Sequence, residues 1–306
     1  MTARILIPAV LFFTCSAAAA ADIPLSLIAE PWEEVYKEVD GIELKLAICY
    51  PAKHRPEMNV PAVVCIHGGG WMAGEPQLFF PHARYFASRG MVAFSVQYRL
   101  TSREGVTVAD CIEDCKSAMR FIRLNAERFG VDPDRIAVLG DSAGGHLAAC
   151  LGVMDDRFDA PGEDRSVSSL ANAMILYNPV VDSTVPELIK YVPYRPIRGE
   201  SGLSRMEIAR RISPLFCVKP GQSPSLVMHG LDDTNVPPDQ ARRFAEAMGK
   251  AGNRCDLVLL PKTQHAFVIV HYSAPDDQVV SAIRRADEFL RSLGYLKGKP
   301  TLVAPK

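Results

Sequence analysis

The chain has 306 residues, 48% of which are hydrophobic, so it can fill the core of one large α/β domain or two small ones. Its 34 Lys and Arg residues nearly balance its 35 Asp and Glu residues, and no long run of one charge occurs. This balance excludes the strongly basic and strongly acidic classes of protein, and we expect neither a nucleic acid nor an anionic membrane as a partner.

Residues 1–21 have the pattern of a secretory signal peptide. Arg4 supplies one positive charge, residues 5–13 are apolar, and small residues follow up to Ala21. The apolar stretch is too short for a transmembrane anchor, and the residues before Cys15 do not favour a lipoprotein signal. We therefore expect cleavage after Ala20 or Ala21, export to the periplasm or the medium, and no membrane anchoring of the mature chain.

The mature chain, residues 22–306, is interpreted as a single domain that opens with a hairpin. Residues 34–39 and 42–50 flank the turn signal Asp40-Gly41, which predicts two antiparallel strands. Short apolar runs and amphipathic helices then alternate. The further expected strands are 62–66, 92–96, 136–139, 173–177, 225–228 and 256–260, and the expected helices are 82–89, 108–129, 146–151, 239–250 and 279–293. This alternation predicts an eight-stranded, mostly parallel sheet with helices on both faces.

Residues 183–214 interrupt the alternation. They contain one short helical stretch, at 205–211, and several prolines and tyrosines: Pro186, Tyr191, Pro193, Tyr194 and Pro196. A long irregular insert is uncommon inside a compact domain and tends to be functional. We interpret this insert as a small lid.

The segment Gly140-Asp141-Ser142-Ala143-Gly144 has the form G-x-S-x-G between an expected strand and an expected helix. In this motif a serine on a sharp turn holds its hydroxyl group above the helix N-terminus, and small neighbours leave room for the turn. The helix dipole and the Ala143 N–H favour negative charge there. Ser142 is therefore the candidate nucleophile. Because the pentapeptide alone recurs by chance, the hypothesis also requires a base, an acid and a second oxyanion donor.

His265 is the candidate base among the seven histidines. It lies in the loop after the expected strand 256–260, and an α/β-hydrolase requires the order Ser, Asp or Glu, then His. A neutral imidazole there can take the Ser142 proton and later return it to the leaving group. His271, in or just beyond the same loop, is the late competitor. The remaining histidines are interpreted as bracing the glycine loop (His67), as structural (His146, His229), as solvated (His54) or as lying on a helix surface (His82).

The loop after the expected strand 225–228 contains two adjacent carboxylates, Asp232 and Asp233. One of them is expected to face His265, and the other to be a turn or cap residue. Asp182, after the preceding strand, is a third candidate for the acid.

Gly68, Gly69 and Gly70 follow the expected buried strand 62–66. Consecutive glycines let bare N–H groups approach a ligand where a Cβ would collide. With the serine motif downstream, we interpret Gly69 and Gly70 as donors that join the Ala143 N–H around an oxyanion. Trp71 is either an anchor of this loop or a substrate-binding wall of the acyl pocket, and both alternatives stay open.

Seven cysteines remain if Cys15 leaves with the signal peptide, and an odd number cannot all pair within the chain. Several of them, including Cys65, Cys111, Cys115 and Cys150, fall on apolar positions of expected strands and helices. We interpret them as mainly buried free thiols. No metal is expected, because His and Cys do not occur at ligand spacing, and no cofactor is expected either.

Four motifs carry a resemblance to a known family. HGGGW at 67–71, YRL at 98–100, DPDRIAVLGDSAGGHLA at 132–148 and HGLDDTNVP at 229–237 resemble the α/β-hydrolase esterases of the hormone-sensitive-lipase-like group, and most of all the bifunctional feruloyl and acetyl xylan esterase type. The motifs occur in the family's order over nearly the whole mature chain. The resemblance implies the α/β-hydrolase fold and places the acid on Asp233. The chain lacks the long N-terminal cap region of larger lipase-like members, which argues against bulky lipid substrates.

The sequence thus predicts an exported, cofactor-free serine esterase in which Ser142 is acylated and His265 activates the water that hydrolyses the acyl-enzyme. The expected substrate is a small-molecule or carbohydrate ester with a short acyl group, such as an acetyl or feruloyl group on a polysaccharide. A second interpretation is a serine peptidase of the same fold, although such peptidases usually carry a large extra domain. A third is a non-catalytic binding module, which would lack one of the three catalytic residues.

Overall fold

The computed structural model describes residues 30–155, 157–192, 195 and 197–302. The predicted signal peptide at 1–21 lies outside the described residues, as do Pro193, Tyr194 and Pro196 of the predicted lid. Within the described ranges, no helix combines the length and the apolar character needed to cross a lipid bilayer.

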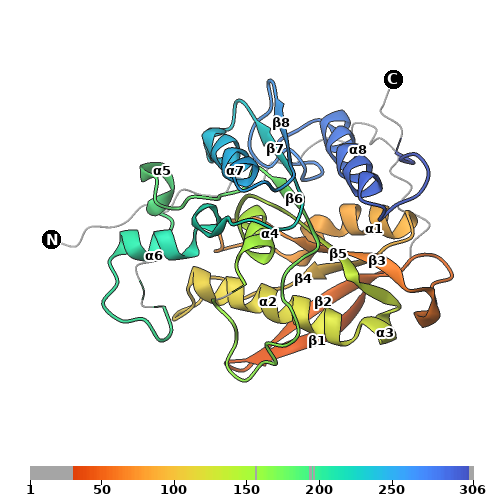
Figure 1. Ribbon diagram of the computed structural model, residues 1–306, viewed down its shortest axis with the longest axis horizontal. Coiled ribbons are helices and arrows are strands. Elements are labelled where there is room, and N and C mark those ends of the chain that lie inside the picture. Colours follow the sequence, from red (N-terminus) through yellow and green to blue (C-terminus); the bar gives the residue numbers. More distant parts are fainter. Residues whose placement is uncertain (1–29, 156, 193–194, 196, 303–306) are drawn as a thin grey trace.

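One eight-stranded sheet forms the centre of the molecule, in the order β1-β2-β4-β3-β5-β6-β7-β8 (Figure 1). The strands β1 and β2 form the predicted hairpin, β2 also pairs antiparallel with β4, and the other neighbours are parallel. This is the mostly parallel sheet that the sequence predicts. The strands are β1 (Trp32–Val39), β2 (Ile42–Cys49), β3 (Val60–Ile66), β4 (Val92–Val96), β5 (Val131–Asp141), β6 (Ala173–Tyr177), β7 (Ser225–Gly230) and β8 (Cys255–Leu260).

Helices cover both faces of the sheet, which explains why the central strands are continuously apolar. In β3, Val64 and Ile66 join the core on one face, and Val63 and Cys65 join the core on the other, as the pleat of a strand requires. The first face packs against α2 (Val108–Leu124), α4 (Ser142–Val153) and α7 (Asp239–Lys250), and the second packs against α1 (Phe80–Ser88) and α8 (Asp276–Ser292).

Two helical predictions are wrong in detail. The expected helix 108–129 is divided at Asn125 into α2 and the short α3 (Ala126–Phe129), because the Asn125 side chain donates to the Phe121 carbonyl and competes with the helix backbone. His82 does not lie on a helix surface but is fully buried beside Phe79 and Tyr177. Its burial lowers the pKa of His82 to about 3, so the imidazole stays neutral.

The insert 183–214 contains α5 (Pro186–Ile189) and α6 (Arg205–Ile212). The helix α6 begins with a capping box between Ser204 and Glu207, which confirms the expected helical stretch. In Figure 1 both helices lie on the left side of the molecule, with α5 above α6.

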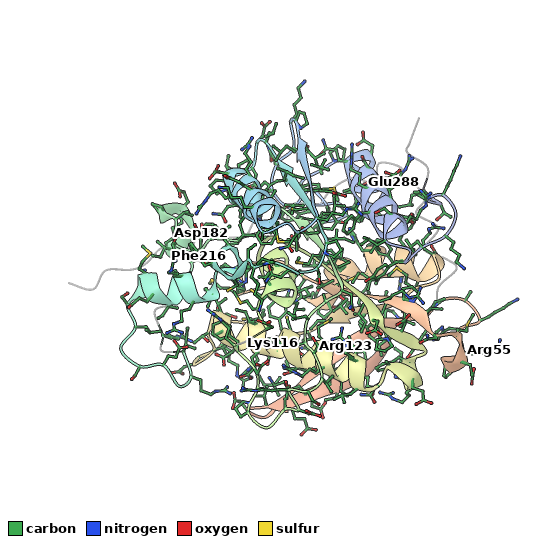
Figure 2. All side chains as sticks on the ribbon, viewed as in Figure 1. Arg55, Lys116, Arg123, Asp182, Phe216 and Glu288 are labelled. Atoms are coloured by element: carbon green, nitrogen blue, oxygen red, sulfur yellow. The ribbon has the colours of Figure 1, made fainter. Side chains whose placement is uncertain are left out.

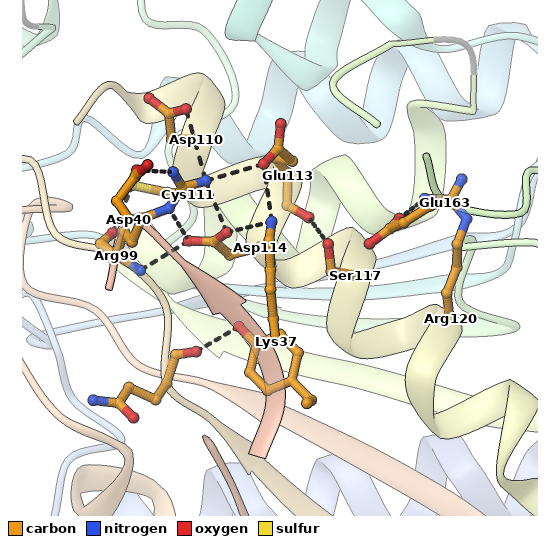
Figure 3. Close-up of polar contacts among 12 residues, drawn as sticks. Lys37, Asp40, Arg99, Asp110, Cys111, Glu113, Asp114, Ser117, Arg120 and Glu163 are labelled. Carbon is orange, nitrogen blue, oxygen red and sulfur yellow. Dashed lines mark hydrogen bonds and ion pairs between the residues drawn. The ribbon is translucent and has the colours of Figure 1, made fainter. Parts of the chain in front are cut away.

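A buried cluster of charges holds the N-terminal half of α2 (Figure 3), and Arg198 ties the insert to it. Arg99 donates to Asp114 from Nε at 2.8 Å and to Glu113 from Nη2 at 3.0 Å. Lys37 of β1 contacts the same two carboxylates, at 2.7 and 2.9 Å. From the insert, Arg198 Nη1 lies 3.0 Å from Glu113 Oε2. The buried charges are therefore paired rather than isolated, as low-dielectric surroundings require.

Candidate active site

Ser142 lies at the turn between β5 and α4, as predicted. Its φ of +52° is in the left-handed region, which is uncommon for a residue with a side chain and marks a strained turn. A Cβ on Gly140 would lie 2.4 Å from the Gly144 oxygen, and a Cβ on Gly144 would lie 2.1 Å from the Ile66 oxygen. The turn therefore packs against itself and against β3 too closely for any side chain at these two positions.

His265 connects Ser142 to Asp233. Its Nε2 lies 2.8 Å from Ser142 Oγ, and its Nδ1 lies 2.7 Å from Asp233 Oδ2. Because an ionised carboxylate only accepts hydrogen bonds, Nδ1 carries a proton, and Nε2 of the neutral ring can accept the serine proton. The three residues follow the ends of β5, β8 and β7, and parallel strands bring these ends to the same edge of the sheet.

Asp233 is the carboxylate that faces His265. Its Oδ1 accepts from the backbone N–H groups of Asn235 and Val236, each at 2.9 Å, and its Oδ2 also lies 3.2 Å from Nε2 of His229. Burial opposes ionisation, but the hydrogen bonds from His229 and His265 outweigh it and hold the pKa of the Asp233 carboxyl well below its usual range. Asp233 is therefore charged at neutral pH, and His229 supports it, a contact that sequence reasoning missed.

The competing candidates face elsewhere. The residue Asp232 is exposed to solvent. Asp182 accepts from the Thr184 hydroxyl group at 2.5 Å and pairs with Arg243 at 2.7 Å, and Figure 2 shows it on the side of the molecule that carries the insert. The side chain of His271 is 67% exposed. None of the three contacts the hydrogen-bonded series from Ser142 to Asp233 within the described part of the chain.

Gly69, Gly70 and Ala143 line one cavity together with Ser142. Gly69 has a φ of +108°, and a Cβ there would lie 2.2 Å from the Ala73 oxygen, so only glycine fits. Among the described residues, neither the Gly69 N–H nor the Gly70 N–H donates to another backbone carbonyl. Both glycines, and Ala143 in the first turn of α4, therefore border the cavity next to Ser142.

Trp71 anchors the glycine loop, which is the first of the two alternatives, and it also lines the cavity. The indole is 3% exposed, and its Nε1 donates to His146 Nδ1 at 3.2 Å. The other ring nitrogen of His146 donates to the carbonyl of Ile212, the last residue of α6, at 2.7 Å. Burial lowers the pKa of His146 to about 4, which keeps this ring neutral. The predicted structural histidine thus links the glycine loop to the insert.

His67 braces the same loop, as predicted. Its ring stacks on Tyr98 at 4.4 Å between centroids, its Nδ1 lies 2.8 Å from the Gly68 oxygen, and the Tyr98 hydroxyl group donates to the His67 carbonyl. By contrast, His54 is half-buried rather than fully solvated. Its Nε2 lies 2.8 Å from the Phe129 carbonyl oxygen, because the loop after β2 folds against the end of α3.

The cavity above Ser142 and His265 has a volume of about 450 Å³. The insert contributes Leu188 and Tyr191 to its wall, so it borders the site as a lid would. Tyr191 is 48% exposed, and Tyr272, from the loop after β8, is 72% exposed. Both rings therefore lie at the mouth of the cavity rather than in its floor.

Asp141 is a member of the site that sequence reasoning missed. It is 3% exposed, lines the cavity, and accepts from the Gly68 N–H at 2.8 Å. Burial raises the pKa of Asp141 to about 6, although the nearby His265 and the Gly68 hydrogen bond act in the opposite direction. Its position directly before Ser142 could have identified it from the sequence, but the motif G-x-S-x-G allows any residue type at that position.

The cysteines are free thiols throughout the described chain, as interpreted from the sequence, and Cys217 and Cys255 are the two that are only partly buried. Burial raises the pKa of Cys49 to about 11, so its thiol stays protonated. The described residues contain no group of three or more His, Cys, Asp or Glu side chains arranged to hold a metal ion.

Comparison of the sequence with known proteins places the chain in a family and identifies relatives of it. Residues 46–248 match the family BD-FAE. The chain is similar to Esterase LipC of Mycobacterium tuberculosis, with 31% identity over 225 residues, which are 70% of this chain and 55% of that protein. It spans about half the length of the curated relatives it matches.

Solved structures cover more of the chain. Thermogutta terrifontis esterase 2 phosphorylated by paraoxon has a TM-score of 0.79 and 41% identity, over 88% of this chain and 96% of that chain. The same esterase with butyrate bound has a TM-score of 0.78 and 42% identity, over 88% and 96%. The fold predicted from the sequence, the α/β-hydrolase fold, is confirmed.

Proposed function

The chain belongs to the BD-FAE family, and on that premise we propose that it is an exported serine ester hydrolase that acts on short acyl esters through an acyl-enzyme on Ser142. The observation that carries the proposal is the continuous hydrogen-bonded series from Asp233 through His265 to Ser142, which opens on a cavity. Export rests on the signal-peptide pattern of residues 1–21 alone.

The proposed reaction has two halves. Ser142 Oγ attacks the ester carbonyl carbon while His265 Nε2 takes the serine proton, and ionised Asp233 stabilises the imidazolium. The carbonyl oxygen becomes an oxyanion that the N–H groups of Gly69, Gly70 and Ala143 bind. The imidazolium then gives its proton to the leaving alcohol. In the second half His265 takes a proton from water, and the hydroxide attacks the acyl carbon. The bond from this carbon to Ser142 Oγ then breaks, His265 returns the proton to Oγ, and the acid is released.

A short acyl group fits the space beside Ser142. The cavity of about 450 Å³ must hold part of the alcohol as well as the acyl group. Structures of Thermogutta terrifontis esterase 2 contain propionate or butyrate, and we propose that this chain binds acyl groups of similar size. At the mouth, the exposed rings of Tyr191 and Tyr272 offer faces on which a sugar ring can stack. We therefore propose an acetyl or feruloyl ester of a polysaccharide as the natural substrate.

Ser142→Ala tests the mechanism. The variant should lose hydrolysis of nitrophenyl acetate by on the order of a thousandfold or more, with folding little changed, since only a hydroxyl group is removed. A fluorophosphonate probe should label the wild type and not the variant. Labelling of both would show that another residue is the nucleophile, and an unlabelled, inactive wild type would favour the non-catalytic binding module.

A series of nitrophenyl esters tests the acyl group. A long apolar tunnel would favour binding by about 0.8 kcal/mol for each buried methylene. Because the cavity of about 450 Å³ must also hold part of the alcohol, we expect kcat/KM for the acetate or butyrate to exceed that for the decanoate at least roughly tenfold, or about 1.4 kcal/mol. The decanoate as the best substrate would replace this proposal with a lipase-like function.

Acetylated xylan tests the alcohol. Tyr191→Ala and Tyr272→Ala should each lower kcat/KM on acetylated xylan by roughly fivefold, equivalent to a ring contact of about 1 kcal/mol, with a smaller loss on nitrophenyl acetate. The matched Tyr→Phe variants keep the ring and should keep most of the xylan activity. Equal losses on both substrates would argue against sugar stacking.

A further inference from the structure

Asp141 occupies a place in the site that the proposed reaction leaves without a role. It is the last residue of β5 and directly precedes Ser142, yet it is separate from the series Ser142–His265–Asp233. Its side chain is nearly inaccessible and still borders the cavity. A buried carboxylate at a reacting centre costs free energy when it is charged, so its presence requires an explanation.

The contact that Asp141 makes is with the loop that carries the oxyanion donors. Asp141 Oδ1 accepts from the Gly68 N–H at 2.8 Å, across 73 positions of the chain. A Cβ on Gly68 would lie 2.8 Å from Oδ2 and 2.9 Å from Oδ1, so the carboxylate and the loop backbone are packed directly against each other. Gly68 immediately precedes Gly69 and Gly70, the two proposed donors.

The other hydrogen bonds to the backbone of this loop hold its carbonyl groups, while the Trp71 indole anchors it through His146. The Tyr98 hydroxyl group donates to the His67 carbonyl at 2.8 Å, and the Thr101 N–H donates to the Trp71 carbonyl at 2.8 Å. Among the described contacts, the bond from Gly68 to Asp141 is the one in which a side chain accepts from a backbone N–H group of the loop. The Gly69 N–H belongs to the next peptide plane and the Gly70 N–H to the one after it, so fixing the Gly68 N–H holds the start of the short segment that carries both donors.

We propose that Asp141 is the positioning residue of the oxyanion loop: its carboxylate fixes the Gly68 N–H and thereby aims the next two amides at the position of the substrate oxyanion. This inference rests on the proposed esterase function. It assigns Asp141 no contact with the reacting atoms and no proton transfer. Its effect is on the transition state, because the oxyanion exists there and not in the bound ester.

The role depends on a hydrogen-bond acceptor rather than on a charge. An asparagine at position 141 can place its amide oxygen where Oδ1 lies and accept from Gly68, whereas alanine cannot. Serine is too short to reach Gly68 in the same way. Removing an oxyanion donor outright costs about a hundredfold to a thousandfold in kcat, so loosening two donors should cost on the order of tenfold to a hundredfold.

The test uses the full chain with the variants Asp141→Ala, Asp141→Ser and Asp141→Asn. Each is assayed with nitrophenyl butyrate and with a trifluoromethyl ketone, to whose carbonyl Ser142 Oγ adds to form a hemiketal with an oxyanion. In the Ala and Ser variants kcat should fall on the order of tenfold to a hundredfold with KM nearly unchanged, and ketone affinity should fall by the same factor. The Asn variant should recover most of both. Asp232→Ala is the matched control, because that carboxylate is exposed.

Each outcome has one meaning. Full kcat in Asp141→Ala or Asp141→Ser would overturn the role of Asp141, as would an Asn variant that is as impaired as the Ala variant. A fall in kcat without a parallel loss of ketone affinity would also overturn it, because the oxyanion site would then be intact. If Asp141→Ala does not fold, the comparison of Ser with Asn decides. Hydrolysis by the wild type that does not depend on Ser142 would overturn the proposed function itself.

Discussion

Replacing Asp141 by asparagine should stabilise the protein, and the gain should depend on pH. In the folded protein burial raises the pKa of Asp141 from its ordinary value of 3.8 to about 6. An acid whose folded pKa is raised binds its proton more tightly in the folded state than in the unfolded state. Between these two values the unfolded chain loses the proton first, so stability is lost as the pH rises.

The magnitude follows from linkage. A difference of about two pKa units, at about 1.36 kcal/mol each, corresponds to about 3 kcal/mol at pH values above both pKa values. At low pH the neutral acid and the amide are nearly isosteric, so Asp141→Asn should change little. When the linkage relation is integrated from about pH 4.5 to about pH 8, about 2 kcal/mol of the gain in the free energy of unfolding develops over this range.

Urea unfolding of the wild type and Asp141→Asn at both pH values measures this difference directly. Titrating groups that do not interact with Asp141 affect both proteins equally and cancel, and Asp232→Asn, at an exposed position, should show no such trend. A gain that is equal at both pH values, or a loss that grows with pH, would refute the argument that the buried carboxylate destabilises the fold.

Further predictions concern the acid, the cavity and the thiols. In Asp233→Asn the amide oxygen is held by the Asn235 and Val236 N–H groups, so the NH2 group faces Nδ1 of His265 and favours the wrong tautomer of the ring. This variant should lower kcat by roughly ten-thousandfold, whereas Asp232→Asn should have little effect; the opposite ranking in steady-state assays would mean that Asp232 faces the base. Asp141 lines the cavity, and among the described residues no Lys or Arg does, so the negatively charged nitrophenyl hemisuccinate should have a lower kcat/KM than the neutral butyrate. Asp141→Asn should bring the two kcat/KM values closer together, and an unchanged ratio would contradict this. Denatured, unreduced protein should titrate the seven described thiols with Ellman's reagent while the native protein reacts slowly, and a single reactive thiol would instead indicate three disulfides.

The sequence by itself determined the features that depend on neighbours along the chain. The hairpin at Asp40-Gly41, the alternation of apolar runs with helices, and the turn that carries Ser142 are all local, because a turn type or a helical period is decided within a few residues. The order of Ser142, a carboxylate and His265 then matched the order that an α/β-hydrolase requires, and parallel strands bring three such residues to one edge of the sheet. Fold class and candidate nucleophile were therefore readable without coordinates.

Only the tertiary structure decided contacts between distant segments. Residue type alone cannot distinguish the adjacent carboxylates Asp232 and Asp233; the resemblance favours Asp233, and the tertiary structure shows the contact with His265 that distinguishes them. The burial of His82 depends on which side of α1 packs on the sheet. The hydrogen bond from Gly68 to Asp141 joins residues 73 positions apart. The pKa of the Asp141 carboxyl depends on the exclusion of water by segments that are distant in the sequence, which no local sequence pattern predicts.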